Sequence, residues 1–278
     1  VPGLAASSST FFVLLGEEAE SFEVRRRLLL TWPECAMSPS SYGAFCHASF
    51  GCVTSAHTWL PSACFEMKLS TGPSTGREAS SRRAAAGHEA ILVEATAERL
   101  GGVDILINNA GTSAFGAFID LPDDAFVDAI NGKLLGYIRC ARAAIPHMQK
   151  RVGGNILNIT GATQQAVPLH TPGSTCNAAV RMFSKELSME LGPMNIRVNS
   201  LGPGRIQTAR ADQLLKANAE TQGISEAEVL SGLVSTIPSN RMGTVADIAD
   251  AVCFLVSERA TYVNGSALVI DGSKSLVI

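Results

Sequence analysis

His170 lies three residues before Gly173, in the segment HTPGSTCNAAVRM (residues 170–182). Its imidazole titrates near neutral pH, so it can gain or lose a proton under physiological conditions. Thr175 and Cys176 lie on the same turn. An imidazole in such a place can act as a general acid or base. The alternative is an exposed loop histidine without a chemical role.

Two glycines follow predicted strands at points where a ligand could approach the backbone. Gly111 ends the motif NNAG (108–111), and Gly204 ends the motif GPG (202–204). Ligands of an open parallel sheet bind beyond the carboxyl ends of its strands, and a glycine lets the backbone come close to them. Asn108 can also hydrogen-bond to a neighbouring strand. The alternative interpretation is that these turns serve the fold alone.

Composition excludes several classes of protein. The chain has 278 residues, of which 46% are hydrophobic and 17% charged, so it is globular rather than disordered. A net charge of -3 gives no reason to expect nucleic acid or an anionic membrane as a partner. No apolar run approaches 18 residues, so no membrane span is predicted. Because the chain does not begin with Met, it could be a fragment or a processed form.

The seven cysteines include no CxxC pair, which favours reduced thiols and a cytoplasmic location. One local group could be taken for a metal site, but its spacings fit no common zinc pattern, and no metal is predicted. The group consists of Cys46, His47, Cys52, His57 and Cys64.

The chain divides into two unlike parts. No Asp or Asn occurs before Asp104, although a folded α/β segment uses these residues in caps and turns. Residues 1–68 are therefore interpreted as a poorly defined N-terminal segment, and residues 69–278 as an α/β domain. After residue 100, apolar runs typical of buried parallel strands alternate with helical patterns, which predicts a doubly wound parallel sheet of Rossmann type. The predicted strands are 103–107, 153–160, 195–201 and 266–271, and the predicted helices are 122–150, 177–191, 209–235 and 244–257.

The longest predicted helix follows DLPDD, where Asp120 can cap it and Pro122 fits its first turn. Its apolar residues recur at steps of three and four, which predicts one continuous core face. These residues are Phe126, Ile130, Leu134, Ile138, Ala141, Ile145 and Met148.

Residues 98–273 resemble the short-chain dehydrogenase/reductase family. Five motifs fall in the family's order and approximate spacing: NNAG (108–111), Asn131 inside the next helix, PGRIQT (203–208), NRMGT (240–244) and VIDGS (269–273). The resemblance implies an NAD- or NADP-dependent oxidoreductase that acts on a small alcohol or carbonyl compound. It also implies a homo-oligomer, a dimer or tetramer, paired through the helices at 122–150 and 177–191. The residues implied to lie beside the cofactor are Asn108, Ala110, Gly111, Pro203, Gly204, Ile206 and Thr208.

The family's proton donor and its cation are missing. When AAVRMFSK (178–185) is matched to the family's helix, Gly173 takes the position of the catalytic Tyr and Asn177 that of the Lys. A neutral amide at 177 can bond a ribose but cannot lower a neighbour's pKa as an ammonium does. The serine position falls at Thr160 or Gly161, and Asn131 keeps its family identity. His170 is the candidate substitute acid.

The first half of the fold is predicted to be incomplete or atypical. The one Gly-rich candidate for a phosphate loop, TGPSTG (71–76), lies only 37 residues before Asn108, too close for two further strands and helices. A compressed first half, which would not bind NAD(P)H with micromolar affinity, is the preferred hypothesis; a plain Ser/Gly turn is the alternative. Residues 82–93 are predicted to pass from a helix into a strand.

Three functional hypotheses remain open. The leading one is an NAD(P)-dependent oxidoreductase with an atypical active site. The second is a catalytically silent protein of the same fold that binds a partner or its own copies. The third is an incomplete gene product that folds poorly.

Overall fold

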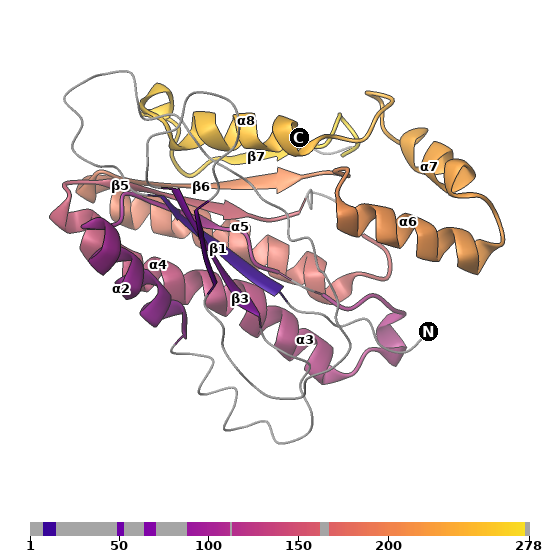
Figure 1. Cartoon of the computed structure of the whole chain (residues 1–278), viewed down its shortest axis with the longest axis horizontal. Helices are drawn as coiled ribbons and strands as arrows, with labels where there is room; N and C mark the ends of the chain where they lie inside the picture. The colour runs from indigo at the N-terminus through magenta and orange to yellow at the C-terminus, as the bar shows by residue number, and fades with distance from the viewer. Residues whose placement is uncertain are drawn as a thin grey trace.

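The computed structural model describes residues 8–14, 49–52, 64–70, 88–111, 113–161 and 167–275. Its centre is a seven-stranded sheet with the order β2-β3-β1-β4-β5-β6-β7 (Figure 1). The strands are β1 (Ser8–Leu14), β2 (Ser49–Cys52), β3 (Cys64–Ser70), β4 (Ile105–Asn108), β5 (Gly154–Ile159), β6 (Ile196–Pro203) and β7 (Ala267–Ile270).

The four strands from β4 to β7 are parallel and carry the predicted doubly wound arrangement. The apolar residues at the centres of β4, β5 and β6 are buried, as expected for strands covered on both faces, whereas β7 at the sheet edge is partly exposed, with Leu268 38% exposed. Because the strands are parallel, the turns after β4, β5 and β6 lie on one common edge. The fold class expected from the sequence is thus confirmed, and this edge is where the predicted site residues gather.

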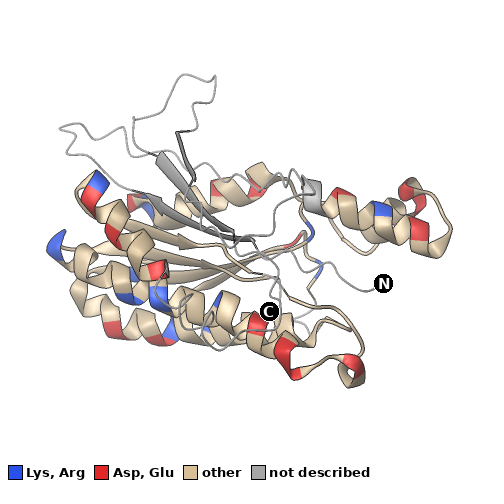
Figure 2. Ribbon diagram, turned by 60° about the horizontal axis from the view of Figure 1, so that its bottom comes forward, with Lys and Arg blue, Asp and Glu red and all other residues tan. Residues whose placement is uncertain are grey.

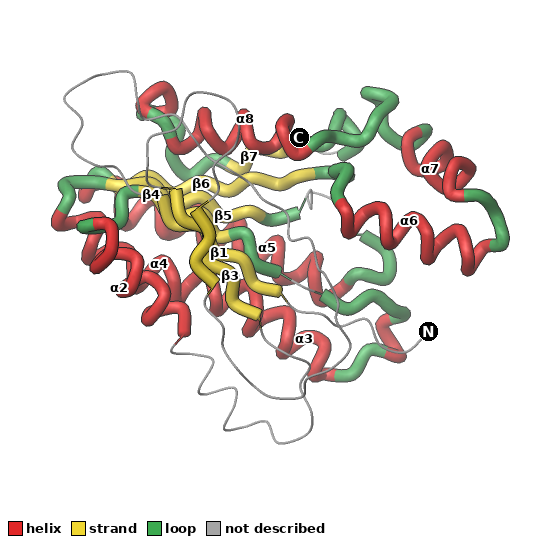
Figure 3. Tube along the Cα trace, in the orientation of Figure 1, coloured by secondary structure: helices red, strands yellow, loops and turns green. Residues whose placement is uncertain are grey.

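Helices cover both faces of the sheet (Figures 1 and 3). On one face, α2, α4 and α5 share a core cluster with β4, β5 and β6, and on the other face α8 packs on the same strands. The helices are α2 (His88–Leu100), α3 (Asp123–Ala129), α4 (Gly136–Lys150), α5 (Thr171–Leu191), α6 (Ala209–Gln222), α7 (Glu226–Val234) and α8 (Val245–Val256). Short turns are η1 (Phe118–Asp120), η3 (Gly192–Met194) and η4 (Glu258–Ala260), and η2 (Ile130–Leu135) is a π-helix.

The first three strands of the sheet are antiparallel to their neighbours. β1 runs antiparallel to both β3 and β4, and β2 runs antiparallel to β3. A first half built from βαβ crossovers would make these neighbours parallel. The segment TGPSTG (71–76) lies outside the described residues, as do the side chains of the cysteine–histidine group between positions 46 and 64.

Two helix predictions are wrong. Residues 88–93 were predicted to run into a strand but form the first half of α2, since Leu92, Val93 and Ala97 share one buried helical face. Asp120 does not cap the helix after DLPDD but belongs to the short turn η1. Helix α3 begins at Asp123 without a side-chain cap, and Asp123 and Asp124 in its first turn suit the positive end of the helix dipole.

The predicted continuous helix 122–150 is interrupted by the π-helix η2. A π turn inserts an extra residue per turn, so the apolar residues before and after it no longer share one face. Ile130 is accordingly 38% exposed, whereas Met148 is fully buried. The helix predicted from 177 begins earlier, at Thr171, with Pro172 in its first turn.

Charged residues lie mainly on the helices, with both signs interspersed (Figure 2). Among the residues that the structure describes, no helix is long and apolar enough to cross a membrane. The same residues contain no group of three or more His, Cys, Asp or Glu side chains placed to hold a metal ion.

Candidate active site at the carboxyl edge of the sheet

Asn108 ties the end of β4 to its neighbours. Its side-chain NH2 donates to Oδ1 of Asn158 on β5 at 2.8 Å, and the amide of Asn158 donates to Ser184 Oγ on α5 at 2.9 Å. All three side chains are buried. The predicted bond from Asn108 to a neighbouring strand is present, and it fixes the end of β4, where the NNAG motif begins, relative to β5.

Tyr137 on α4 connects the ends of β4 and β5 at the same edge. Its hydroxyl lies 2.7 Å from the carbonyl oxygen of Ala110 and 2.9 Å from that of Ile159, so one proton is shared between the ends of β4 and β5. Burial raises the pKa of Tyr137 well above its ordinary value. This tyrosine is therefore a structural tie rather than a proton donor for a substrate.

The residues after β6 make contacts that serve the fold. A Cβ on residue 204 would lie 2.5 Å from the Cβ of Asp271, so only glycine fits between the ends of β6 and β7. Ile206 is buried and bridges to Gly243, and the hydroxyl of Thr208 caps α6 by accepting from the Ala211 amide at 3.2 Å. Pro203 is the last residue of β6.

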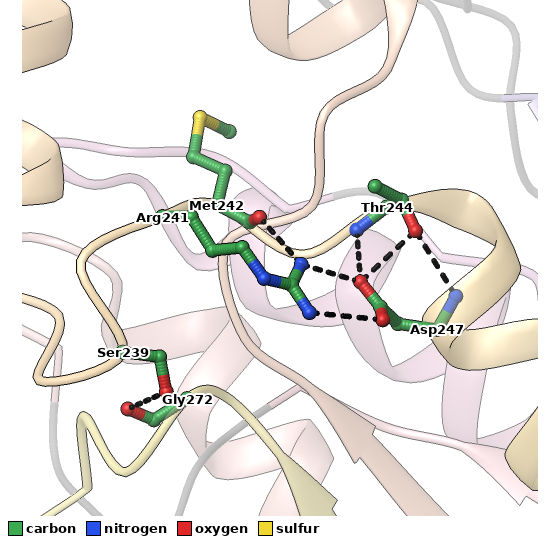
Figure 4. Close-up of polar contacts among 6 residues, drawn as sticks. All are labelled: Ser239, Arg241, Met242, Thr244, Asp247 and Gly272. Atoms are coloured by element: carbon green, nitrogen blue, oxygen red, sulfur yellow. Dashed lines mark hydrogen bonds and ion pairs between the residues drawn. The ribbon is translucent and has the colours of Figure 1, made fainter.

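Side-chain hydrogen bonds fix the NRMGT segment (240–244) at the start of α8 (Figure 4). Arg241 donates through both terminal nitrogens to the carboxylate of Asp247, at 2.7 and 3.0 Å. The same carboxylate accepts from the backbone and the hydroxyl of Thr244, which completes a capping box at the start of α8. These hydrogen bonds hold the pKa of Asp247 well below its usual range, and the bond from Arg241 has the largest effect. Backbone bonds between Gly243 and the segment 205–207 connect this loop to the end of β6.

His170 takes the place of a side chain at position 173. It stands at the N-cap of α5, and its ring stacks on Phe115 with centroids 4.2 Å apart and an angle of 15° between the planes. The Cε1 and Nε2 atoms of His170 occupy the space where a Cβ on Gly173 would be. The imidazole is therefore held between Phe115 and the helix backbone, over the residue that the family resemblance matches to its acid.

Lys133 brings an ammonium to position 177. The π-helix η2 carries Lys133, and its Nζ donates to Oδ1 of Asn177 at 2.6 Å. The Nζ also lies 6.0 Å from the centroid of the Tyr137 ring, and Asn177 itself is buried. A Cβ on Gly111 would lie 3.2 Å from Cδ of Lys133, so the glycine leaves room for this side chain against the end of β4.

Burial lowers the pKa of Lys133 to about 8, although the nearby Cys176 thiol partly offsets this effect. Desolvation disfavours the charged form of a lysine, because water no longer solvates the ammonium. Burial likewise raises the pKa of Cys176, and Lys133 acts in the opposite direction. The ammonium is thus charged at neutral pH but much closer to its titration point than a surface lysine.

Two other predicted residues are placed differently. The Thr160 hydroxyl lies 3.1 Å from the Gly161 carbonyl oxygen and 3.3 Å from that of Leu201, so its proton is directed at the backbone between β5 and β6. Asn131 is half-buried on η2, two residues before Lys133. Lys133, not Asn131, extends from this helix to Asn177.

The sequence reasoning missed Lys133. A signal was present, because Lys133 lies three residues after Ile130 and seven after Phe126, on the face predicted to be apolar. A charged residue on a core face needs a partner or a function. The structure brings His170 and Lys133 to positions 173 and 177 of α5, which lie one helical turn apart on the same side.

Comparison with known proteins agrees with this architecture. Residues 85–273 match the family model described as enoyl-(acyl carrier protein) reductase. The 2-(R)-hydroxypropyl-CoM dehydrogenase of Xanthobacter autotrophicus is 33% identical over 189 residues, which cover 66% of this chain and 72% of the relative. The 3α-hydroxysteroid dehydrogenase of Mediterraneibacter gnavus is 34% identical over 187 residues, 66% of this chain and 69% of the relative.

A solved structure is similar over the same part. The L-sorbose reductase of Gluconobacter frateurii, in complex with NADPH and L-sorbose, superimposes with a TM-score of 0.67 at 30% identity, covering 69% of this chain and 74% of the reductase. The match of more than half of the chain to the family model, together with these relatives and the parallel sheet, shows that the chain belongs to the short-chain dehydrogenase/reductase family.

Proposed function

We propose that the protein is an NAD(P)-dependent oxidoreductase that interconverts a small alcohol and its carbonyl compound, with His170 as the proton donor. The observation that carries this proposal is the imidazole of His170, which lies over Gly173, the residue matched to the family's acid, and stacks on Phe115. The relatives named above, two dehydrogenases and an NADPH-bound reductase, support the reaction class.

The residues at the carboxyl edge fit a nicotinamide nucleotide. The Lys133 ammonium and the Asn177 amide provide donors suited to ribose hydroxyls, and Gly111 leaves the strand end bare beside them. On the other side, the turn from Pro203 to Thr208 would lie beside the nicotinamide. Asn108 and Ala110 would act through the position of the strand end, since their side-chain amide and carbonyl are already bonded within the protein.

The proton and the hydride travel to different atoms of the substrate. When bound, the reduced cofactor supplies a hydride to the carbonyl carbon, which forms the new C–H bond with both of its electrons. His170 in its protonated form donates its proton to the carbonyl oxygen, so the products are an alcohol, the oxidised cofactor and neutral imidazole, which is reprotonated from water. Asn131 is proposed to bind a relaying water. The Thr160 hydroxyl already donates to the backbone and is therefore given no bond to the substrate oxygen.

The substrate side of this edge is apolar. Phe115 is 64% exposed and Phe118 is 71% exposed, both in the segment between β4 and α3, and Phe115 contacts His170 directly. Exposed aromatic side chains beside a proton donor suit the carbon skeleton of a ketone or secondary alcohol.

We also propose that the protein is a homo-oligomer paired through α4 and α5. Met182 and Met189 lie seven residues apart on α5, and they are 62% and 68% exposed. An apolar stripe of this kind on a long helix favours burial against a second copy. Light scattering after gel filtration would give a dimer or tetramer mass, and Met182→Glu with Met189→Glu would give the monomer mass.

Two assays test the oxidoreductase proposal. Saturation-transfer NMR with NADH and NADPH measures weak binding of either cofactor, and the absorbance of the reduced cofactor with a panel of ketones measures turnover. Binding with ketone-dependent oxidation supports the proposal. Binding without any turnover across the panel favours the silent binding protein, and absence of binding by a protein that melts cooperatively overturns the dinucleotide role itself.

A further inference from the structure

We propose that Lys133 supplies the positive charge of this site, in place of the lysine that the family resemblance puts at position 177, and that its ammonium binds the ribose of the nicotinamide nucleotide. This inference rests on the proposed dinucleotide function. It assigns the cation to a different helix, because the side chain comes from the π-helix η2 and not from α5.

The contact between Asn177 and Lys133 supports the placement of this charge on η2 instead of α5. Its side-chain oxygen accepts from Lys133 Nζ at 2.6 Å, so the ammonium lies where the end of a longer side chain at 177 would be directed. Asn177 is buried and therefore holds a fixed orientation. One of the three protons of the ammonium is used by this bond, which leaves two donors for a ligand.

The surroundings of Lys133 argue against a purely structural role. No carboxylate forms a salt bridge with it among the residues that the structure describes. Its neighbours are the Asn177 amide and the Cys176 thiol on α5, the Tyr137 ring on α4 and the bare Gly111 after β4. Lys133 is half-buried, so its ammonium loses part of its water without a compensating anion. Such a loss costs stability, and groups of this kind concentrate at functional sites. A negatively polarised ligand at this edge would compensate the charge.

The charge also has an expected pH range. Because burial lowers the pKa of Lys133 to about 8, the ammonium is present at neutral pH and is lost in moderately alkaline solution. Cys176 and Tyr137, the titratable groups facing it from α5 and α4, both have pKa values raised by burial, so each loses its proton at a higher pH than it ordinarily would. Binding that depends on Lys133 therefore weakens as the pH rises through about 8.

The experiment compares cofactor binding in four proteins by saturation-transfer NMR and calorimetric titration between pH 7 and 9.5. They are the wild type, Lys133→Met, the double variant Lys133→Met with Asn177→Lys, and Lys150→Met, which removes an exposed lysine near the end of α4. Thermal melts by circular dichroism verify that each protein is folded. We expect Lys133→Met to bind roughly tenfold more weakly or not at all, because a charge-assisted hydrogen bond is lost.

The double variant returns the ammonium to α5 and is expected to recover most of the lost affinity, while Lys150→Met binds as the wild type does. The wild-type affinity falls above pH 8, and that of Lys133→Met stays constant. Equal binding by wild type and Lys133→Met at every pH overturns the role of Lys133 but leaves the oxidoreductase proposal intact. If folded wild type binds neither NADH nor NADPH, both proposals fall together.

Discussion

The imidazole of His170 occupies the space that a β-carbon on residue 173 would fill. A methyl group at 173 therefore displaces the ring from its stack on Phe115. We predict that Gly173→Ala and His170→Ala each lower kcat for ketone reduction by about 100-fold, the lower end of the usual contribution of a general acid. The absorbance of the reduced cofactor provides the measurement.

Two controls separate this effect from damage to the helix. Thr175→Ala, an exposed position on the same turn, should keep full activity. The double variant of His170 and Gly173 should be no worse than either single variant, because both changes remove the same group. Full activity in His170→Ala would rule out the proposed acid.

Lys133→Met is predicted to make the protein more stable at neutral pH even as it impairs binding. A lysine with a lowered pKa in the folded state binds fewer protons there than in the unfolded chain. Folding stability of the wild type is therefore lowest when the lysine is fully charged, below pH 8, and it rises as the pH climbs from about 8 toward 10.5. The stability advantage of Lys133→Met over the wild type should therefore shrink as the pH rises from about 8 toward 10.5.

Thermal melts at pH 6.5, 7.5 and 9.5 measure this difference. Lys150→Met, which alters an exposed lysine, should track the wild type at all three values. A methionine variant that melts below the wild type at pH 6.5 would show that the ammonium stabilises the fold.

Tyr137→Phe is predicted to lower the free energy of unfolding by about 1–3 kcal/mol, because the carbonyl groups of Ala110 and Ile159 lose their shared donor. The ends of β4 and β5 are then free to separate, so cofactor binding should weaken as well. Urea denaturation followed by circular dichroism measures the first effect. Tyr262→Phe is the matched control, since Tyr262 is fully exposed and its loss should change neither quantity.

Thr244→Ala is predicted to cost about 1 kcal/mol, the usual value of a helix N-cap. The Asp247 carboxylate that shares this capping box has a pKa far below its usual range, since Arg241 and Thr244 bond to its charged form. The stability it contributes is complete at neutral pH and is lost progressively as the pH falls from the ordinary carboxyl pKa to that depressed pKa. Asp247→Asn should therefore destabilise the protein equally at pH 7 and pH 5.

Melts of these two variants provide the test. Thr221→Ala changes an exposed threonine within α6 that caps no helix, and it should melt like the wild type. A stability difference for Asp247→Asn that vanished by pH 5 would mean that the carboxylate is unpaired in solution.

The sequence predicted the parallel half of the fold well, because buried strands such as β5 and β6 are short apolar runs bounded by turn residues. It could not predict the ends of helices that depend on tertiary contacts. Helix α5 begins at Thr171 rather than Asn177, and this places His170 at its N-cap beside Gly173. Spacing alone left that histidine indistinguishable from one in an exposed loop.

The position of Lys133 was unpredictable for a related reason. An ideal helix of 3.6 residues per turn would put Ile130, Leu134 and Ile138 on one face, and Lys133 beside them has no obvious partner in the sequence. The π-helix changes the angles between these side chains around the helix axis, and no local sequence preference predicts a π-helix here. The antiparallel direction of β1 could not be predicted either, since a short apolar run fits either strand direction.

The extra residue in η2 makes the chemistry of this edge dependent on chain length as well as on residue type. Removing one residue, such as Gly132, would let η2 relax to an ordinary α-helix and turn everything before it by about 100° relative to α4. Ile130 could then regain the core, while Asn131 and the residues of α3 would change the side on which they face α5. A single-residue deletion could thus separate the binding edge from the helix beneath it without altering any side chain that touches a ligand.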